Sequence, residues 1–249
     1  MMKAAMKLTD RHIVLTGATS GIGREIATML APANRLTMVG RRHPPVLEPT
    51  AAGPHRFIEA DLADPEAVRI AAVVLAADGT PVDGLINCAA VQFTPRLVDP
   101  DFDPSGVARE VAINFVGPVL LIAGLLEAME RADAPFILNV NSGLGLVPKA
   151  RSAVYCASKA ALDSFSRSLR GQLADTQIQV MQAFLPVVDT PMTEGRGGDK
   201  MSAASAARAI LRGIEREVAD NDIGKVSLLR MLRRLSPRLA ARVMQGHGQ

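Results

Sequence analysis

The stretch "TGATSGIG" (Thr16–Gly23) decides the fold, because it joins an apolar run to a helical pattern through a glycine-rich turn. It overlaps "HIVLT" (His12–Thr16), which predicts a buried strand, and it leads into a predicted helix from about Ile22 to Ala31. Its glycines have the spacing G-x-x-x-G-x-G. Glycines between a strand and a helix allow a tight turn and let a pyrophosphate reach free backbone N–H groups. The stretch predicts a dinucleotide-binding unit, although a glycine turn needed only for packing can have the same spacing.

The rest of the chain alternates short apolar runs with longer helical patterns, which is typical of a parallel sheet with helices on both faces. Further strands are predicted at Arg35–Val39, His55–Ala60, Asp83–Cys88, Phe136–Asn141 and Ile178–Phe184. Helices are predicted at about Pro65–Ala77, Ser105–Arg131 and Ala153–Ala174. We therefore expect one doubly wound, Rossmann-type α/β domain over residues 1–249.

Two stretches depart from this alternation. Arg41–Pro54 contains four prolines where a crossover helix is expected. Proline removes a donor and breaks helices, so we expect that helix to be short or absent. Thr193–Lys200 is glycine-rich and polar. It predicts a mobile loop after the sixth strand, where a doubly wound fold has its ligand crevice.

The composition limits the classes of function. Hydrophobic residues make up 48% of the 249 residues and aromatic residues only 3%, so the core is expected to be aliphatic. A net charge of +3 does not favour nucleic acid as a partner. Neither the two cysteines nor the four histidines have the spacing of a disulfide framework or a metal site. We predict no metal, no signal peptide, no membrane span and a cytoplasmic location.

The second predicted strand ends in "VGRR", with Arg41 and Arg42 and no acidic residue. In a dinucleotide fold an acid here binds the ribose 2′-hydroxyl, whereas an arginine favours a 2′-phosphate. Arg41 therefore predicts NADP(H) in preference to NAD(H), the alternative being a solvated pair of arginines. Asp61 follows the third strand and is a candidate adenine contact. Its alternative is local helix capping, since Asp64 and the proline after it have the chemistry of a helix start.

The chain contains a single tyrosine, Tyr155, and Lys159 follows it by four residues. Residues four apart share one face of a helix. An ammonium group beside a phenol lowers the pKa of the phenol from about 10, which suits it to proton transfer. Ser142 lies at the end of the fifth predicted strand, where its hydroxyl can hold a substrate oxygen. Each residue alone has an ordinary packing or surface role, but together with the glycine turn they indicate an oxidoreductase.

These motifs together resemble the short-chain dehydrogenases/reductases along most of the chain. The matching segments are "TGATSGIG", "DL" (Asp61–Leu62), "INCAA" (Ile86–Ala90), "INFVGP" (Ile113–Pro118), "NVNSG" (Asn139–Gly143) and "YCASK" (Tyr155–Lys159). The segments "NSGLGLVP", "LPVVDTPM" and "GKVSLLRMLRRLSP" are most similar to bacterial oxidoreductases of the D-alanine-lipoteichoic-acid-operon type. That name records an operon and not a substrate.

The resemblance implies a catalytic tetrad of Asn114, Ser142, Tyr155 and Lys159. Tyr155 would be the acid/base, and Ser142 would position the substrate oxygen. Lys159 would lower the pKa of the tyrosine and bind the nicotinamide ribose, while Asn114 would hold a water in a proton relay. The implied cofactor contacts are Gly17, Thr19, Ser20, Gly21, Ile22, Gly23, Arg41, Asp61, Leu62, Asn87, Ala89, Tyr155, Lys159, Val188 and Thr190.

The chain departs from the family pattern at three points. Leu185–Pro186 stands where many members have Pro-Gly, Asn87–Ala90 stands in place of "NNAG", and the usual glycine-rich ending is absent. The expected substrate is a small carbonyl compound or alcohol. Its pocket is expected around Gln92–Arg96, Leu144–Ala150 and Pro191–Met201, with Arg96, Lys149 and Arg196 available for an acidic group. We also expect a homodimer or homotetramer paired through the helices at about 105–131 and 153–174.

The C-terminal segment from about residue 225 is basic and amphipathic, with six Lys or Arg and no acid between Ile223 and Gln249. It predicts a helix that covers the core or forms a subunit contact. Attachment to an anionic membrane surface is the less favoured alternative.

The sequence thus predicts NADP(H)-dependent reduction of a carbonyl or oxidation of the corresponding alcohol. Two alternatives stay open at this point. One is a dinucleotide-binding sensor or membrane-docking protein with little turnover. The other is related cofactor chemistry, such as epimerisation or dehydration.

Overall fold

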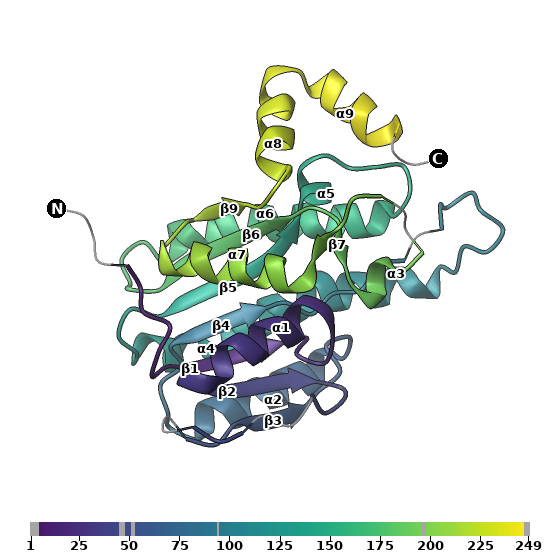
Figure 1. Ribbon diagram of the computed structural model, residues 1–249. Coiled ribbons are helices and arrows are strands. Elements are labelled where there is room, and N and C mark those ends of the chain that lie inside the picture. Colours follow the sequence, from purple (N-terminus) through teal and green to yellow (C-terminus); the bar gives the residue numbers. More distant parts are fainter. Residues whose placement is uncertain (1–4, 45–47, 51–52, 94, 196–197, 247–249) are drawn as a thin grey trace.

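The computed structural model describes residues 5–44, 48–50, 53–93, 95–195 and 198–246. Its central sheet is parallel throughout and has seven strands in the order β3-β2-β1-β4-β5-β6-β9 (Figure 1). The strands are β1 His12–Thr16, β2 Arg35–Gly40, β3 Arg56–Glu59, β4 Gly84–Asn87, β5 Phe136–Ser142, β6 Gln179–Leu185 and β9 Asp220–Asp222. The chain order reverses between β1 and β4, which is the switch point where doubly wound sheets bind their ligands. The predicted fold class is confirmed.

Helices cover both faces of this sheet (Figure 1). They are α1 Gly21–Leu30, α2 Pro65–Ala77, α3 Ser105–Val111, α4 Gly117–Glu130, α5 Gly143–Leu146, α6 Ala153–Gln172, α7 Ala203–Glu215, α8 Val226–Leu235 and α9 Pro237–Gly246. One face carries α1 and α7, and the other carries α2, α4 and α6. A two-stranded pair, β7 Val188–Asp189 with β8 Met201–Ser202, follows the sixth strand.

The core has two layers because successive side chains of a strand point to opposite faces of the sheet. All five residues of β1 are buried. Ile13 and Leu15 pack in the layer that contains Ile26 of α1, whereas Val14 packs in the layer that contains Leu125 of α4. A strand buried on both faces needs a continuous apolar run, which is the pattern that predicted it.

The predicted strands agree with the structure within one residue at each end, and the predicted helices within two. The described part of Arg41–Pro54 contains no helix, as its prolines predict. The predicted helix at 105–131 contains a π-helical turn, Ala112–Val116, between α3 and α4. Together they form one stretch that is long and apolar enough to cross a membrane by length and composition alone, and 44% of its apolar window is buried inside the protein.

Three strands were not predicted: the short pair β7 and β8, and one strand of the central sheet, β9. β9 has the sequence "DND" (Asp220–Asp222), without any apolar run, and it pairs with β6 at the edge of the sheet. Side chains hold it: Arg170 of α6 pairs with Asp220, and Arg230 of α8 donates two hydrogen bonds to the carboxylate of Asp222, at 2.6 and 2.8 Å. Tertiary ion pairs therefore replace the hydrophobic signal that marks the other strands.

Two glycine-to-alanine changes are expected to have opposite effects on stability. A methyl group at Gly84 in β4 would overlap the ring of Phe136, which is fully buried in β5. We expect Gly84→Ala to lower the free energy of unfolding by about 1–3 kcal/mol through overpacking. Gly171 in α6 has open space where a methyl group would go. Gly171→Ala should raise that free energy by about 0.5–1 kcal/mol, because alanine is the better helix former. Urea unfolding of the parent and both variants measures these free energies. Changes of the same sign in the two variants would contradict the prediction.

Candidate active site

The structure brings Tyr155 and Lys159 together on the inward face of α6, and both are buried. The Nζ atom of Lys159 lies 5.9 Å from the centroid of the Tyr155 ring. The same ammonium donates a hydrogen bond of 2.9 Å to the carbonyl oxygen of Val140 in β5. This bond fixes the lysine between the helix and the sheet, beside the phenol.

Burial sets the electrostatics of this pair. Desolvation lowers the pKa of Lys159 from its usual 10.5 to about 8, and the neighbouring Cys88 opposes that shift. Desolvation also raises the pKa of the Cys88 thiol to about 12. At neutral pH the lysine is therefore mainly an ammonium ion, and Cys88 stays a neutral thiol. Burial likewise raises the pKa of Cys156, which argues against a nucleophilic role for that neighbour of Tyr155.

Ser142 ends β5 and also begins α5. Its Oγ accepts a hydrogen bond of 3.1 Å from the N–H of Leu144, and it donates to no residue that the structure describes. The hydroxyl hydrogen is therefore available to a substrate oxygen. A methyl group at Gly145 of α5 would come within 2.9 Å of the backbone of Lys159. This close packing of α5 on α6 fixes the position of Ser142 relative to Lys159.

Asn114 is fully buried in the π-helical turn. Its Oδ1 accepts from the N–H of Val91 at 2.9 Å, and its Nδ2 donates to the carbonyl of Val91 at 2.8 Å. Nδ2 also donates to Oγ of Ser158 in α6, at 3.2 Å. The side chain thus joins the segment after β4 to α6, which it reaches through a hydrogen bond to Ser158. π-helical turns of this kind are frequent at functional sites.

The glycine turn lies at the carboxyl end of β1 and has the form of a phosphate cradle. Gly17 has φ +80° and Gly21 has φ +52°, the left-handed region that favours glycine. A methyl group at Gly17 would lie 2.8 Å from the backbone nitrogen of Ala89, so the ends of β1 and β4 meet closely. Ser20 begins α1 without a side-chain hydrogen bond to the helix. The first N–H groups of α1 therefore have no side-chain cap, and this arrangement fits the pyrophosphate of a dinucleotide.

The end of β4 supplies a second observation that fits a dinucleotide. Asn87 is buried, and its Nδ2 donates to Oδ1 of Asn139 at 2.9 Å. Its own Oδ1 is buried without a hydrogen-bond partner. A buried acceptor without a partner destabilises the fold. A ribose hydroxyl is a donor of the kind that would satisfy this oxygen.

Three charged side chains meet beyond the end of β2. Nε of Arg41 lies 4.0 Å from Oδ1 of Asp61, and Nη2 of Arg109 lies 3.0 Å from Oδ2. Partial burial would raise the pKa of Asp61, but the N–H of Ala63 and the two guanidinium groups outweigh it and lower that pKa. Arg109 belongs to α3 and was missed by sequence reasoning, because no motif marks it. The capping role considered for this region belongs to Asp64, whose Oδ1 accepts two N–H groups of α2.

The segment after β6 crosses the start of α1. A methyl group at Gly21 would lie 2.9 Å from Cγ2 of Thr190, so the structure brings that threonine to the glycine turn. Val188 is buried in β7. Of the other predicted contacts, Gly23 and Leu62 are buried, and Thr19 and Ile22 are half-buried. Arg196, a predicted pocket residue, lies outside the described residues.

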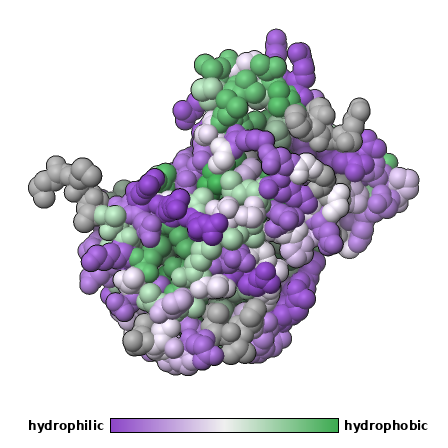
Figure 2. Space-filling model, in the orientation of Figure 1, coloured by the Kyte–Doolittle hydropathy of each residue, from purple (hydrophilic) through white to green (hydrophobic). Residues whose placement is uncertain are grey.

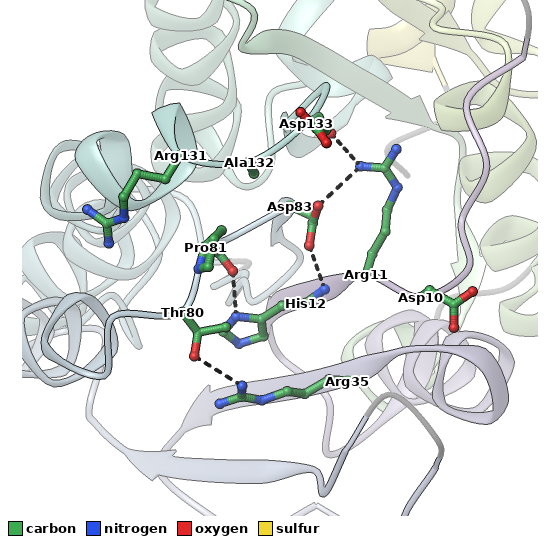
Figure 3. Close-up of a pocket in the computed structure, with 10 residues that line it drawn as sticks. All are labelled: Asp10, Arg11, His12, Arg35, Thr80, Pro81, Asp83, Arg131, Ala132 and Asp133. Atoms are coloured by element: carbon green, nitrogen blue, oxygen red, sulfur yellow. Dashed lines mark hydrogen bonds and ion pairs between the residues drawn. The ribbon is translucent and has the colours of Figure 1, made fainter.

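A pocket at the opposite end of the sheet does not belong to this site (Figure 3). Its charged and polar groups largely satisfy one another: Arg11 lies 3.5 Å from Asp83, and Nδ1 of His12 bonds the carbonyl of Pro81 at 3.0 Å. Burial lowers the pKa of His12. The pocket lies where β1 begins, whereas ligands of parallel sheets bind where the strands end. Within the described ranges, no group of three or more His, Cys, Asp or Glu side chains has an arrangement that could hold a metal ion.

Comparisons with known proteins agree with this geometry. The family model for short chain dehydrogenases matches residues 11–200. The uncharacterized oxidoreductase DltE of Bacillus subtilis is 33% identical over 192 residues, which is 76% of each chain. The fatty acyl-CoA reductase of Acinetobacter baylyi is 33% identical over 186 residues, or 72% of this chain and 63% of that protein. A short chain dehydrogenase of Burkholderia cenocepacia in complex with NADP has the same fold, with a TM-score of 0.86 at 23% identity over 96% of this chain and 100% of that one.

Both the predicted family and the similarity to the operon-type bacterial oxidoreductases are confirmed. The chain belongs to the short-chain dehydrogenase/reductase family and is an oxidoreductase that uses a nicotinamide dinucleotide to act on a small-molecule substrate.

Proposed function

We propose that the protein reduces a carbonyl compound with NADPH, or oxidises the corresponding alcohol with NADP⁺, and that Tyr155 exchanges the proton. The observation that carries this proposal is the buried ammonium of Lys159, held 5.9 Å from the centre of the Tyr155 ring. When bound, the nicotinamide supplies or accepts the hydride. We also propose that residues 1–249 form one domain, with a basic C-terminal segment from about residue 225.

Three side chains of the site take part in the proton transfer, each in a different role. In the reducing direction the phenol of Tyr155 donates its proton to the substrate oxygen. The ammonium of Lys159 stabilises the phenolate that remains. Ser142 donates its free hydroxyl hydrogen to the same substrate oxygen, while the N–H of Leu144 holds its Oγ in place. These donors act in a buried site, where hydrogen bonds to developing charge are stronger than in water.

Asn114 acts as a positioning residue in this proposal. Its three hydrogen bonds hold the segment after β4 against α6, and so fix one wall of the site next to Tyr155. We also propose that a water bound near Asn114 relays the proton between Lys159 and solvent. The cofactor contacts proposed from the sequence are the glycine turn, Asn87 and Ala89 at the end of β4, and Val188 and Thr190 after β6.

The experiment that tests the proposed function is a panel of aldehydes and ketones, with the absorbance of NADPH as the readout. Consumption of NADPH with at least one carbonyl compound supports it. Tight NADPH binding without turnover of any compound would favour a sensor. Turnover without net consumption of NADPH would favour epimerisation or dehydration.

Arg41 is expected to set the preference for the 2′-phosphate. Its side chain is 54% exposed and lies 4.0 Å from Asp61, and the end of β2 itself carries no acidic residue. We expect Arg41→Glu to weaken NADPH binding at least tenfold and to leave NADH binding nearly unchanged, because a carboxylate repels a phosphate. Titration of both cofactors at low salt measures this. Arg208→Glu, an equal change of charge on α7, is the control. Equal loss for both cofactors, or none for NADPH, would refute the assignment.

We expect a dimer or tetramer that pairs through the outer faces of α4 and α6. The outward residues of α6 include Ala157, Ala160 and Ser164, which are exposed in the single chain. Small side chains of this kind let helices approach closely. Sedimentation velocity at micromolar concentration should show an oligomer, and Ala160→Arg should shift it toward smaller species. A parent protein that sediments only as a monomer would refute this expectation.

A further inference from the structure

The helices α8 and α9 form a pair that stands out from the rest of the molecule (yellow in Figure 1). One side of the pair is firmly attached. Val226 and Ala240 are buried in a small cluster with Phe184 of β6. The guanidinium of Arg230 lies 4.4 Å from the centre of the Phe184 ring, besides its bonds to β9. The sequence-based expectation of a segment that covers the core therefore describes only one side of the pair.

The other side of α8 is apolar and uncovered. Leu228, Met231 and Leu235 are 60%, 52% and 77% exposed. Their spacing of three and four residues places them in one row along the helix, away from the buried Val226. Leu239 and Val243 of α9 are 43% and 38% exposed. Figure 2 shows an apolar patch at this end of the molecule, and exposed apolar patches of this kind mark interaction sites.

The positive charge of α8 and α9 indicates which kind of partner the exposed apolar side of this helix pair binds. The last 27 residues, from Ile223 on, contain no Asp or Glu. Of the basic residues there, Lys225 pairs with Asp199 and Arg230 with Asp222. The remaining four make no ion pair with any residue in the described ranges: Arg233, Arg234, Arg238 and Arg242. A second copy of the chain would oppose like charges across the contact, whereas an anionic surface would neutralise them.

We infer that the face formed by α8 and α9 docks on an anionic lipid membrane. The apolar row enters the boundary between headgroups and acyl chains, and the four arginines bind lipid phosphates, as in interfacial amphipathic helices. α8 also lies next to the end of β5, the strand that ends in Ser142. A methyl group at Gly143, directly after Ser142, would come within 3.4 Å of Val226 and 3.3 Å of Leu229. A docked α8 therefore holds the substrate end of the active site close to the lipid surface.

Vesicle co-sedimentation of the full chain tests this inference. We expect binding to phosphatidylcholine vesicles with about 30% phosphatidylglycerol at ~0.1 M NaCl, and much weaker binding to pure phosphatidylcholine. Raising the salt to ~1 M should weaken the binding, because the Debye length falls from about 10 Å to about 3 Å. The triple change Leu228→Gln, Met231→Gln and Leu235→Gln should lower the partition coefficient at least about tenfold, because it removes the apolar row.

The control uses a second exposed apolar pair, on α2, where Ile70 and Val73 are 51% and 55% exposed. The double change Ile70→Gln and Val73→Gln should leave vesicle binding unchanged. Glutamine keeps helix propensity high, and circular dichroism confirms that each variant is folded. Equal binding to anionic and neutral vesicles, or equal binding by parent and triple variant, would overturn the inference. A triple variant that sediments as a smaller oligomer without vesicles would also overturn it, since the face would then join two copies of the chain.

Discussion

Tyr155→Phe is expected to lower the turnover of NADPH with a carbonyl substrate by about 10³-fold, because it removes the group that donates the proton. The benzene ring fills the same buried space, so the affinity for NADPH should change little. Initial rates of NADPH oxidation and a separate titration of the cofactor measure the two quantities.

A neighbour on the same helix provides the control for that substitution. Cys156 is buried beside Tyr155, and its thiol has a raised pKa because of its burial. Cys156→Ala should keep most of the turnover, since the proposed mechanism does not use this side chain. Parent-like turnover in Tyr155→Phe would remove the tyrosine from the mechanism. Loss of turnover in Cys156→Ala alone would point to a different chemistry.

Lys159→Met is expected to lower turnover at least about 10²-fold without lowering the stability of the cofactor-free protein at pH 7. The reason is that burial depresses the pKa of this lysine to about 8. A charge that is buried at neutral pH destabilises the fold, and methionine removes the charge but keeps an apolar stem. A variant that is inactive yet equally or more stable would place Lys159 in catalysis and not in structure.

The pH dependence of stability checks the same group. Because the folded pKa of about 8 lies below the usual 10.5, the unfolded chain binds more protons between these values. The parent should therefore gain about 1–3 kcal/mol of unfolding free energy relative to Lys159→Met as the pH rises from about 8 to about 10.5. Urea unfolding of both proteins at several pH values measures the difference, in which other titrating groups cancel. A difference that does not change with pH would contradict a buried, charged lysine.

The elements that the sequence predicted are those whose own residues carry the signal. β1 contains the apolar run Ile13–Leu15, and all five of its residues are buried. The start of α2 was visible because Asp64 and Pro65 have the chemistry of a helix cap, and Asp64 does cap the helix. Tyr155 and Lys159 lie together because a spacing of four residues fixes one helical face whatever the surroundings.

The features that the sequence did not predict depend on partners far along the chain. β9 has only polar residues, and arginines of two other elements hold it. Arg109 reaches Asp61 from 48 residues away, so no local spacing could reveal it. The C-terminal segment was predicted as amphipathic, but the periodicity could not show that α8 is apolar on two sides, one packed and one exposed. The split of this segment into two helices at Pro237 has a local cause instead, the missing N–H of proline, and the sequence carried that signal.

Deuterium transfer tests the central claim most directly. The parent protein is incubated with the carbonyl panel and with NADPH in which both hydrogens at C4 of the nicotinamide are replaced by deuterium, and the products are analysed by mass spectrometry. The account predicts an alcohol that carries deuterium on the former carbonyl carbon, formed by the parent and by Cys156→Ala and reduced to trace amounts in Tyr155→Phe. Oxidation of NADPH that leaves every product without deuterium would contradict it, because the hydride would then not reach the carbonyl carbon.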